Sequence, residues 1–253
     1  MWGRFTHLNL RLQRARNIQV VMCGRYAANR DTGTLTEVFK LKNLPSQLLI
    51  ENYNISPTSK TYAIRLDKNQ NRTLEIMTWG LIPSWAKDNS MSAKMINARF
   101  ETVDEKPSFR SAFSKRRCIV PMDGYYEWFR PLNPKEKKQP YFIKAKNSPL
   151  LAVAGIYEIW KNPDTKNYEP EVHSFSVITT EAKLGLETIH DRMPVLVPDK
   201  NWQAWLDPSI QNKEEIRSLV ATPPNDYFEY FKVSSDVNNA RNNGHLLIQP
   251  TAE

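Results

Sequence analysis

The sequence predicts an α+β fold in which a mainly antiparallel, barrel-like β-sheet core carries peripheral helices. Two patterns predict it: short β-prone runs recur along the chain with turn residues between them, and helical spacing is confined to a few short segments. The composition is a third observation, because 253 residues with 40% hydrophobic side chains and seven tryptophans can bury a substantial core. This balance excludes disordered and fibrous classes.

The first 21 residues differ in composition from the rest of the chain. They contain no acidic residue and four arginines, at Arg4, Arg11, Arg14 and Arg16. From Met22 onward the sequence changes in kind. We therefore expect residues 1–21 to be a leader or a misassigned start outside the fold, and residues 22–253 to form one domain. We favour the misassigned start. A leader that the protein cleaves itself and an organelle-targeting leader are the alternatives.

The expected elements follow in chain order. Asp31 or Thr32 can cap a short helix that runs to Leu41, and residues 52–60 are expected to form a polar loop. The β-prone runs 61–67 and 73–82 are separated by a polar turn, which predicts a hairpin. Further strands are expected at 118–122, 125–129, 140–145, 150–160, 175–180 and 193–197. Further helical spacing covers 107–113, 181–189, 199–206 and 211–221.

Several function classes are disfavoured by simple counts. No apolar run approaches the roughly 18 residues that span a bilayer, so we expect no membrane partner and a soluble, cytoplasmic protein. The two cysteines form no CxxC pair or Cys/His cluster, which argues against a disulfide framework and a zinc site. The net charge is +8, and half of it comes from the acid-free leader. The remaining excess is compatible with phosphate contacts and decides little.

Cys23 is the first candidate for chemistry, because Met22 directly before a Cys-Gly pair resembles a true translation start. Methionine removal would give Cys23 a free α-amine, whose pKa is about 8 against about 10.4 for lysine. A neutral amine adds to an aldehyde, and the neighbouring thiol can then close a five-membered thiazolidine ring. The alternative is that Cys23 is one more small, buried apolar residue.

Three further segments carry candidate residues. Asn97 and Arg99 lie in INARFET, which is either a strand end that presents a donor and a phosphate clamp or merely a turn. Glu127 alternates with the aromatic residues around it in DGYYEWF, so a barrel wall could bury it and raise its pKa, although a solvated glutamate is the commoner outcome. His190 lies in IHDRMP, where a structural role competes with a catalytic one.

Aromatic and remaining reactive residues have weaker signals. Trp79, Trp85 and Trp128 could stack on unpaired bases, although tryptophans in such a domain are usually in the core, and exposure separates the two interpretations. We expect plain packing or surface roles for Cys118, His173 and His245.

Six segments in this order resemble the SOS response-associated peptidase family. They are MCGR (22–25), YNISP (53–57), WGLIPSWAKD (79–88), INARFET (96–102), DGYYEW (123–128) and IHDRMP (189–194). The resemblance extends from residue 22 to the segment HLLIQP at 245–250, and six linked motifs are far more specific than any one of them. It implies a compact domain that binds single-stranded DNA carrying abasic sites, acts as a monomer and needs no cofactor or metal.

The resemblance also implies roles for individual residues. Cys23 would be the nucleophile that forms the thiazolidine, Asn97 would position its amine, and Glu127 and His190 would transfer protons. Arg25, Arg99 and Arg192 would hold phosphates, Asn54 would line the site, and Trp85 and Trp128 would contact bases. The same Cys, Asn, Glu and His group would serve for autoproteolysis ahead of the cysteine.

The sequence departs from the family pattern in two places. Residues 1–21 would leave Cys23 without a free amine if they persisted, and Ser56 replaces an expected alanine with little consequence.

Two other function classes stay open. A conventional thiol peptidase using Cys23, His190 and Asn97 would not need a free amine at Cys23. A binding module that only shields single-stranded DNA would show steep salt dependence and would not need the Cys23 thiol.

Overall fold

The computed structural model describes residues 23–129, 131, 133, 135–165 and 170–251. Its strands are β1 (Tyr26–Ala28), β2 (Asn52–Ile55), β3 (Lys60–Leu66), β4 (Arg72–Trp79), β5 (Asn97–Arg99), β6 (Arg117–Met122), β7 (Gly124–Phe129), β8 (Gln139–Ala145), β9 (Leu151–Trp160), β10 (Val172–Glu181), β11 (Arg192–Pro194) and β12 (Phe228–Lys232). Its helices are α1 (Thr32–Phe39), α2 (Arg110–Lys115), α3 (Trp202–Leu206) and α4 (Lys213–Ser218).

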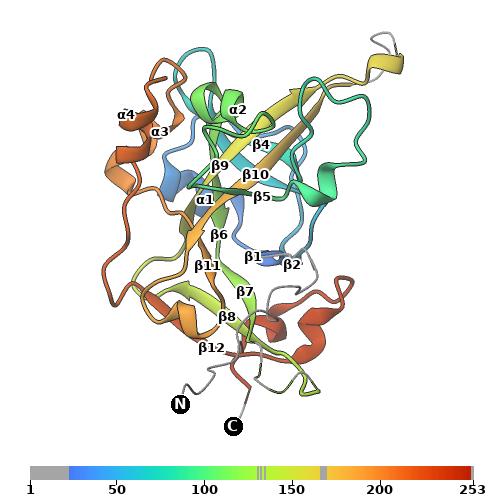
Figure 1. Ribbon diagram of the computed structural model, residues 1–253, viewed down its shortest axis with the longest axis vertical. Coiled ribbons are helices and arrows are strands. Elements are labelled where there is room, and N and C mark those ends of the chain that lie inside the picture. Colours follow the sequence, from blue (N-terminus) through green and yellow to red (C-terminus); the bar gives the residue numbers. More distant parts are fainter. Residues whose placement is uncertain (1–22, 130, 132, 134, 166–169, 252–253) are drawn as a thin grey trace, which may run out of the picture.

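Five strands close into a barrel, which confirms the predicted α+β class with a barrel-like core. The hydrogen-bonded order β10-β4-β3-β6-β9 returns to β10 through the antiparallel β9–β10 pairing. The short strands β5 and β11 add to β10. Pairing is antiparallel except where β10 meets β4 and β5. Figure 1 shows β4, β9 and β10 crossing in the upper part of the molecule.

Side chains alternate between two apolar faces along the barrel strands, as the period of two in a strand requires. One set fills the barrel and includes Met77, Trp79, Val120 and Phe175. The other set faces outward, and α1 to α4 cover it with Phe39, Phe113, Trp205 and Ile216, among others. Burial on both faces explains why β6 and β9 are apolar almost throughout.

A second sheet, of order β12-β8-β7-β1-β2, lies below the barrel in Figure 1. The chain passes from barrel to sheet where β6 ends and β7 begins, with Asp123 between them. Gly124 is required at this point, because a Cβ there would lie 2.5 Å from a ring atom of Phe142 and 2.6 Å from the carbonyl oxygen of Ile143. This junction brings β7 to the end of the barrel.

Several predicted boundaries are corrected by the structure. The helix expected at 181–189 is wrong, since β10 extends to Glu181 and only the 3-10 turn Leu186–Thr188 follows. Leu184 and Gly185 have positive φ angles of 65° and 85°, which a helix does not accommodate. The loop expected at 52–60 contains β2, which pairs with β1. The other helical segments form helices that are shorter than predicted.

Among the described residues, no helix is long and apolar enough to cross a membrane.

A buried arginine joins the barrel to the helices. Arg117, the first residue of β6, is 2% exposed, and burial lowers its pKa to about 10. Its guanidinium donates to five backbone carbonyls, which belong to Phe113, Ser114, Trp205, Asp207 and Ile210. These carbonyls lie at the ends of α2 and α3 and in the loop that follows α3, so one side chain holds three separate segments on the barrel.

Replacement of Arg117 by methionine should lower the free energy of unfolding by about 3–5 kcal/mol, because several buried carbonyls would lose their donor. Urea denaturation followed by tryptophan fluorescence measures the change. Arg110→Met is the matched control: Arg110 is exposed, so its replacement should change stability by no more than about 0.5 kcal/mol. Equal losses in the two variants would contradict the role assigned to Arg117.

Candidate functional site

The strand pairing of β1 and β7 places Cys23 beside Glu127. Tyr26 lies opposite Tyr125, and the amide of Tyr126 donates to the carbonyl of Arg25 at 2.9 Å. The antiparallel register therefore runs the residues before Tyr26 alongside those after Tyr125. The backbone nitrogen of Cys23 donates to Oε1 of Glu127 at 2.7 Å, in a buried hydrogen bond. The first motif and the fifth thus meet at one point.

Glu127 is buried, the outcome that the alternation along DGYYEWF left open. Glu127 is 2% exposed, and its side chain points to the opposite side of β7 from that of Tyr126. The Tyr126 hydroxyl donates to the carbonyl of Tyr53. Burial raises the pKa of Glu127 to about 7, although hydrogen bonds with Cys23 act to lower it. A carboxyl with this pKa can accept or donate a proton near neutral pH.

His190 lies on the other side of the same carboxyl. Its Nε2 is 3.9 Å from Oε2 of Glu127, and its Nδ1 is 2.8 Å from Oδ1 of Asp191. The amide of Arg192 also approaches Nδ1, at 3.2 Å. The His190 side chain is only 7% exposed. The structure therefore brings Cys23, Glu127 and His190 together, with Glu127 in the centre.

Cys23 itself has an unusual environment and backbone. Burial, the neighbouring Glu127 carboxyl and a hydrogen bond with it raise the pKa of the Cys23 thiol well above its usual range, while the charge of Arg192 acts in the opposite direction. Its φ angle is 44°, in the left-handed region that non-glycine residues rarely adopt. Such backbone geometry is concentrated at functional sites.

Asn97 reaches the same end of the barrel from another strand. It opens β5, where it pairs with Val177 of β10, and its side chain is half-buried. Ile96, directly before it, belongs to the hydrophobic cluster that contains Cys23. Within INARFET, Asn97–Arg99 therefore form a short strand and a turn follows it, while the roles of Asn97 as a donor and Arg99 as a phosphate clamp stay predictions.

Arg25 and Asn54 bind each other. The guanidinium of Arg25 donates to Oδ1 of Asn54 at 2.8 Å and to the carbonyl of Val237 at 2.9 Å. The Asn54 amide is 2% exposed and donates to the carbonyls of Val237, Asn239 and Asn242. This pair fixes the segment around Val237 against β1 and β2, and its contact with DNA stays a prediction.

The other two candidate arginines differ in their freedom. Arg192 forms a two-pronged ion pair with Glu101, with both distances 2.8 Å, and also donates to the carbonyl of Thr179. Arg99 is exposed, and within the described part of the chain its side chain has no hydrogen bond or ion pair. Arg99 is therefore available to a phosphate, whereas Arg192 would have to share its guanidinium or exchange its partner.

Exposure separates the three candidate tryptophans. Trp79 is fully buried and donates to the carbonyl of Ile96, so it is a core residue. Trp85 is 62% exposed, with another exposed apolar residue, Met91, later in the same segment. Trp128 is partly buried and donates from its ring nitrogen to Oδ1 of Asn238 at 2.7 Å. Trp85 is the tryptophan best placed to contact a base.

Sequence reasoning missed two residues. Tyr125 lies two positions before Glu127 on β7, so it shares the face of that carboxyl, and it packs in the cluster that contains Cys23. The same alternation that singled out Glu127 could have found it. Glu101 was missed because nothing local in the sequence indicates its ion pair with Arg192, 91 residues away.

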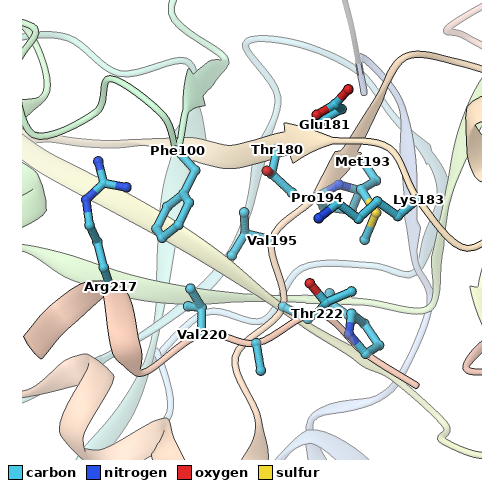
Figure 2. A pocket seen from close by; sticks show the side chains of 13 residues that line it. Phe100, Thr180, Glu181, Lys183, Met193, Pro194, Val195, Arg217, Val220 and Thr222 are labelled. Carbon is cyan, nitrogen blue, oxygen red and sulfur yellow. The ribbon is translucent and has the colours of Figure 1, made fainter. Parts of the chain in front are cut away.

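A shallow pocket lies between β10, β11 and the segment 220–223 (Figure 2). Phe100, Met193, Val195 and Val220 give it an apolar lining, and Lys183 and Arg217 add positive charge. None of the predicted site residues lines this pocket. Within the described residues, no group of three or more His, Cys, Asp or Glu side chains is arranged to hold a metal ion.

Comparisons with known proteins give one consistent result. The model of the family described as SOS response associated peptidase matches residues 22–240. The chain is 41% identical over 229 residues to the abasic site processing protein YoqW of Bacillus subtilis, covering 90% of this chain and 99% of the relative. It is 31% identical over 275 residues to the abasic site processing protein HMCES of Rattus norvegicus, covering 90% and 76%.

A crystal structure of a protein from Bacteroides thetaiotaomicron has the same fold. It superposes with a TM-score of 0.78 at 27% identity, and the match covers 91% of this chain and all of the other. Sequence and structure comparisons thus agree over nearly the whole chain. The protein belongs to the SOS response-associated peptidase family, whose members include abasic site processing proteins.

Proposed function

We propose that this protein is an abasic-site sensor that captures damaged single-stranded DNA covalently through Cys23. In this proposal residues 1–21, which lie outside the described residues, are a leader or a misassigned start, residues 22–253 form one domain, and loss of Met22 gives Cys23 a free amine. The similarity to abasic site processing proteins supports this choice of substrate. The observation that carries the proposal is the 2.7 Å contact between the nitrogen of Cys23 and the buried carboxyl of Glu127.

The first step is addition of the Cys23 amine to the aldehyde of the ring-opened sugar. A nitrogen–carbon bond forms, the carbonyl π bond breaks, and a proton moves from nitrogen to oxygen. Glu127 lies within hydrogen-bond distance of that nitrogen and has a pKa of about 7, so it can relay this proton. The remaining proton of the nitrogen is then transferred to the hydroxyl, the carbon–oxygen bond breaks to release water, and an imine is formed.

The second step closes the ring. The Cys23 sulfur adds to the imine carbon, and the thiol proton passes to the nitrogen, which balances the reaction with the loss of one water overall. The raised pKa of the thiol means that a base must remove its proton, and Glu127 is the carboxyl that contacts it. His190, 3.9 Å from Glu127, can exchange protons with that carboxyl, and Asn97 would orient the amine.

DNA would be held by the outward-facing residues around the site. Arg99 and Trp85 are exposed, so they can contact a phosphate and a base directly. Arg25, Asn54, Trp128 and Arg192 would act next to them, after some exchange of their present partners. The protein would work as a cytoplasmic, DNA-associated monomer without a metal or cofactor.

Removal of the residues before Cys23 would be a second activity of the same site. Cys23 supplies a nucleophile, Glu127 a proton acceptor and donor, and His190 a second such group, which together suit cleavage of the bond before Cys23. This would be peptidase activity within the chain itself. If translation starts at Met22, only that methionine has to be removed.

Incubation with a single-stranded oligonucleotide that carries one abasic site should give an adduct that survives denaturation. Intact mass spectrometry should show a protein that begins at Cys23, and an adduct lighter by one water than the sum of its parts. Cys23→Ser should give no stable adduct, whereas Cys118→Ala, which removes the other thiol, should retain it. A complex that dissociates in denaturant would indicate a binding module, and cleavage of added peptides a conventional thiol peptidase.

Trp85→Ala should weaken binding to intact single-stranded DNA by about 1–3 kcal/mol, because a stacking platform for one base is lost. Fluorescence anisotropy measures the affinity. Met91→Ala removes an exposed apolar side chain from the same segment and should leave the affinity within about 0.5 kcal/mol. Equal losses in both variants would argue for general apolar contact instead of stacking.

The pKa of Glu127 predicts a pH-dependent stability in protein that retains residue 22. The folded pKa of about 7 exceeds the ordinary value of 4.5, so between these values the folded state binds more protons than the unfolded state. The free energy of unfolding should therefore fall by about 3 kcal/mol as pH rises from 4.5 to above 7.

Glu127→Gln should remove that fall, and urea denaturation across this pH range measures it for both proteins. Glu105→Gln, at an exposed glutamate, should keep the pH profile of the unchanged protein. Parallel profiles for Glu127→Gln and the unchanged protein would show that Glu127 has an ordinary pKa.

A further inference from the structure

We propose that the hydroxyl of Tyr125 is a further catalytic group of this site, donating a hydrogen bond to the oxygen on the carbon that the Cys23 amine attacks. This inference rests on the proposed function and adds a residue to it. In the proposed reaction the Cys23 nitrogen and sulfur form the new bonds and the Glu127 carboxyl transfers protons. None of these groups donates a fixed hydrogen bond to the carbonyl oxygen. Tyr125 supplies that missing contact.

The position of Tyr125 supports this role. It lies on β7 two residues before Glu127, so both side chains extend from the same face of the strand. It packs in one cluster with Cys23, Ile189 and Met193, which flank the site. Its residue is 2% exposed, and its hydroxyl is fully buried. The hydroxyl is therefore buried on the side of β7 that carries Glu127.

The Tyr125 hydroxyl also lacks a partner. It makes no hydrogen bond with any residue that the structure describes. Other buried tyrosines behave differently: the hydroxyl of Tyr26 donates to Thr61 at 3.0 Å, that of Tyr126 donates to the carbonyl of Tyr53 at 2.7 Å, and that of Tyr62 accepts from the amide of Leu49 at 2.6 Å.

An unsatisfied buried hydroxyl opposes folding, because its lost hydrogen bonds with water are not replaced, so phenylalanine would suit folding better at position 125. A group that opposes stability and lies in a reactive site is best explained by a partner that arrives with the substrate.

The chemistry of aldehyde capture needs such a donor. When the amine attacks, the carbonyl oxygen gains negative charge, and a fixed donor in a dry site stabilises that charge. Burial, with smaller contributions from the charges of Cys23 and Glu127, raises the pKa of Tyr125 well above its usual range. Tyr125 thus stays protonated while Glu127 titrates, so it supplies a hydrogen bond and Glu127 supplies the protons.

The test compares Tyr125→Phe with Tyr126→Phe in protein that begins at Cys23. Adduct formation with a single-stranded oligonucleotide carrying one abasic site is quenched at intervals and resolved on denaturing gels. Tyr125→Phe should slow the initial rate at least about tenfold, since one oxyanion donor is removed. Its affinity for an intact strand should not change, and its urea midpoint should equal or exceed that of the unchanged protein.

Tyr126→Phe is the matched control because its hydroxyl has a partner in the fold. It should lower the urea midpoint and leave the rate within about threefold, a change of about 0.65 kcal/mol in the barrier. An unchanged rate for Tyr125→Phe, or a loss of stability like that of Tyr126→Phe, would overturn the inference while leaving covalent capture intact. If protein that begins at Cys23 forms no adduct, the proposed function itself fails, and this inference with it.

Discussion

The hydrogen bond between the Cys23 nitrogen and the Glu127 carboxyl is the constraint around which the site is organised. A carboxyl taken out of water loses several kcal/mol of solvation, so it has to be neutralised or bonded. Here the Glu127 carboxyl is buried on β7, where it accepts a hydrogen bond from the Cys23 nitrogen on one side and lies near the His190 ring on the other. Its raised pKa is the direct result. Glu127 lies on β7 shortly after the chain passes from β6 to β7. The close packing at Gly124, the first residue of β7, fixes the start of this strand and so the position of Glu127.

The sequence predicted the architecture well where β-prone runs were long and bounded by turn residues. The barrel strands β3, β4, β6, β9 and β10 were all expected near their observed positions for this reason. β1 and β5 are three-residue strands, too short to show a period, and their pairing depends on distant partners. The helix expected at 181–189 failed because the spacing of apolar residues suits a helix, while Leu184 and Gly185 turn the chain with positive φ angles.

Within the site, local patterns identified the reactive residues better than their partners. The Cys-Gly pair after Met22 and the alternation around Glu127 pointed to two residues that meet in the structure, with the backbone nitrogen of Cys23 2.7 Å from the Glu127 carboxyl. The contacts of the candidate DNA-binding residues could not be foreseen, since Arg192 pairs with Glu101 and Asn54 with carbonyls more than 180 residues away. The structure thus divides these residues into an outward-facing group, with Arg99 and Trp85, and an internally bonded group that would have to reorganise around a DNA strand.

The backbone conformation of Cys23 depends on whether a residue precedes it. A φ angle is defined by the peptide bond that precedes a residue, so the left-handed value of 44° exists only while another residue is attached to Cys23. A non-glycine residue in that region stores on the order of 1–3 kcal/mol. When the preceding peptide bond is absent, the φ angle is no longer defined and its strain energy is lost. The hydrogens on the Cys23 nitrogen can then rotate toward its hydrogen-bond acceptor. The fold therefore tolerates a preceding residue but is more relaxed without one.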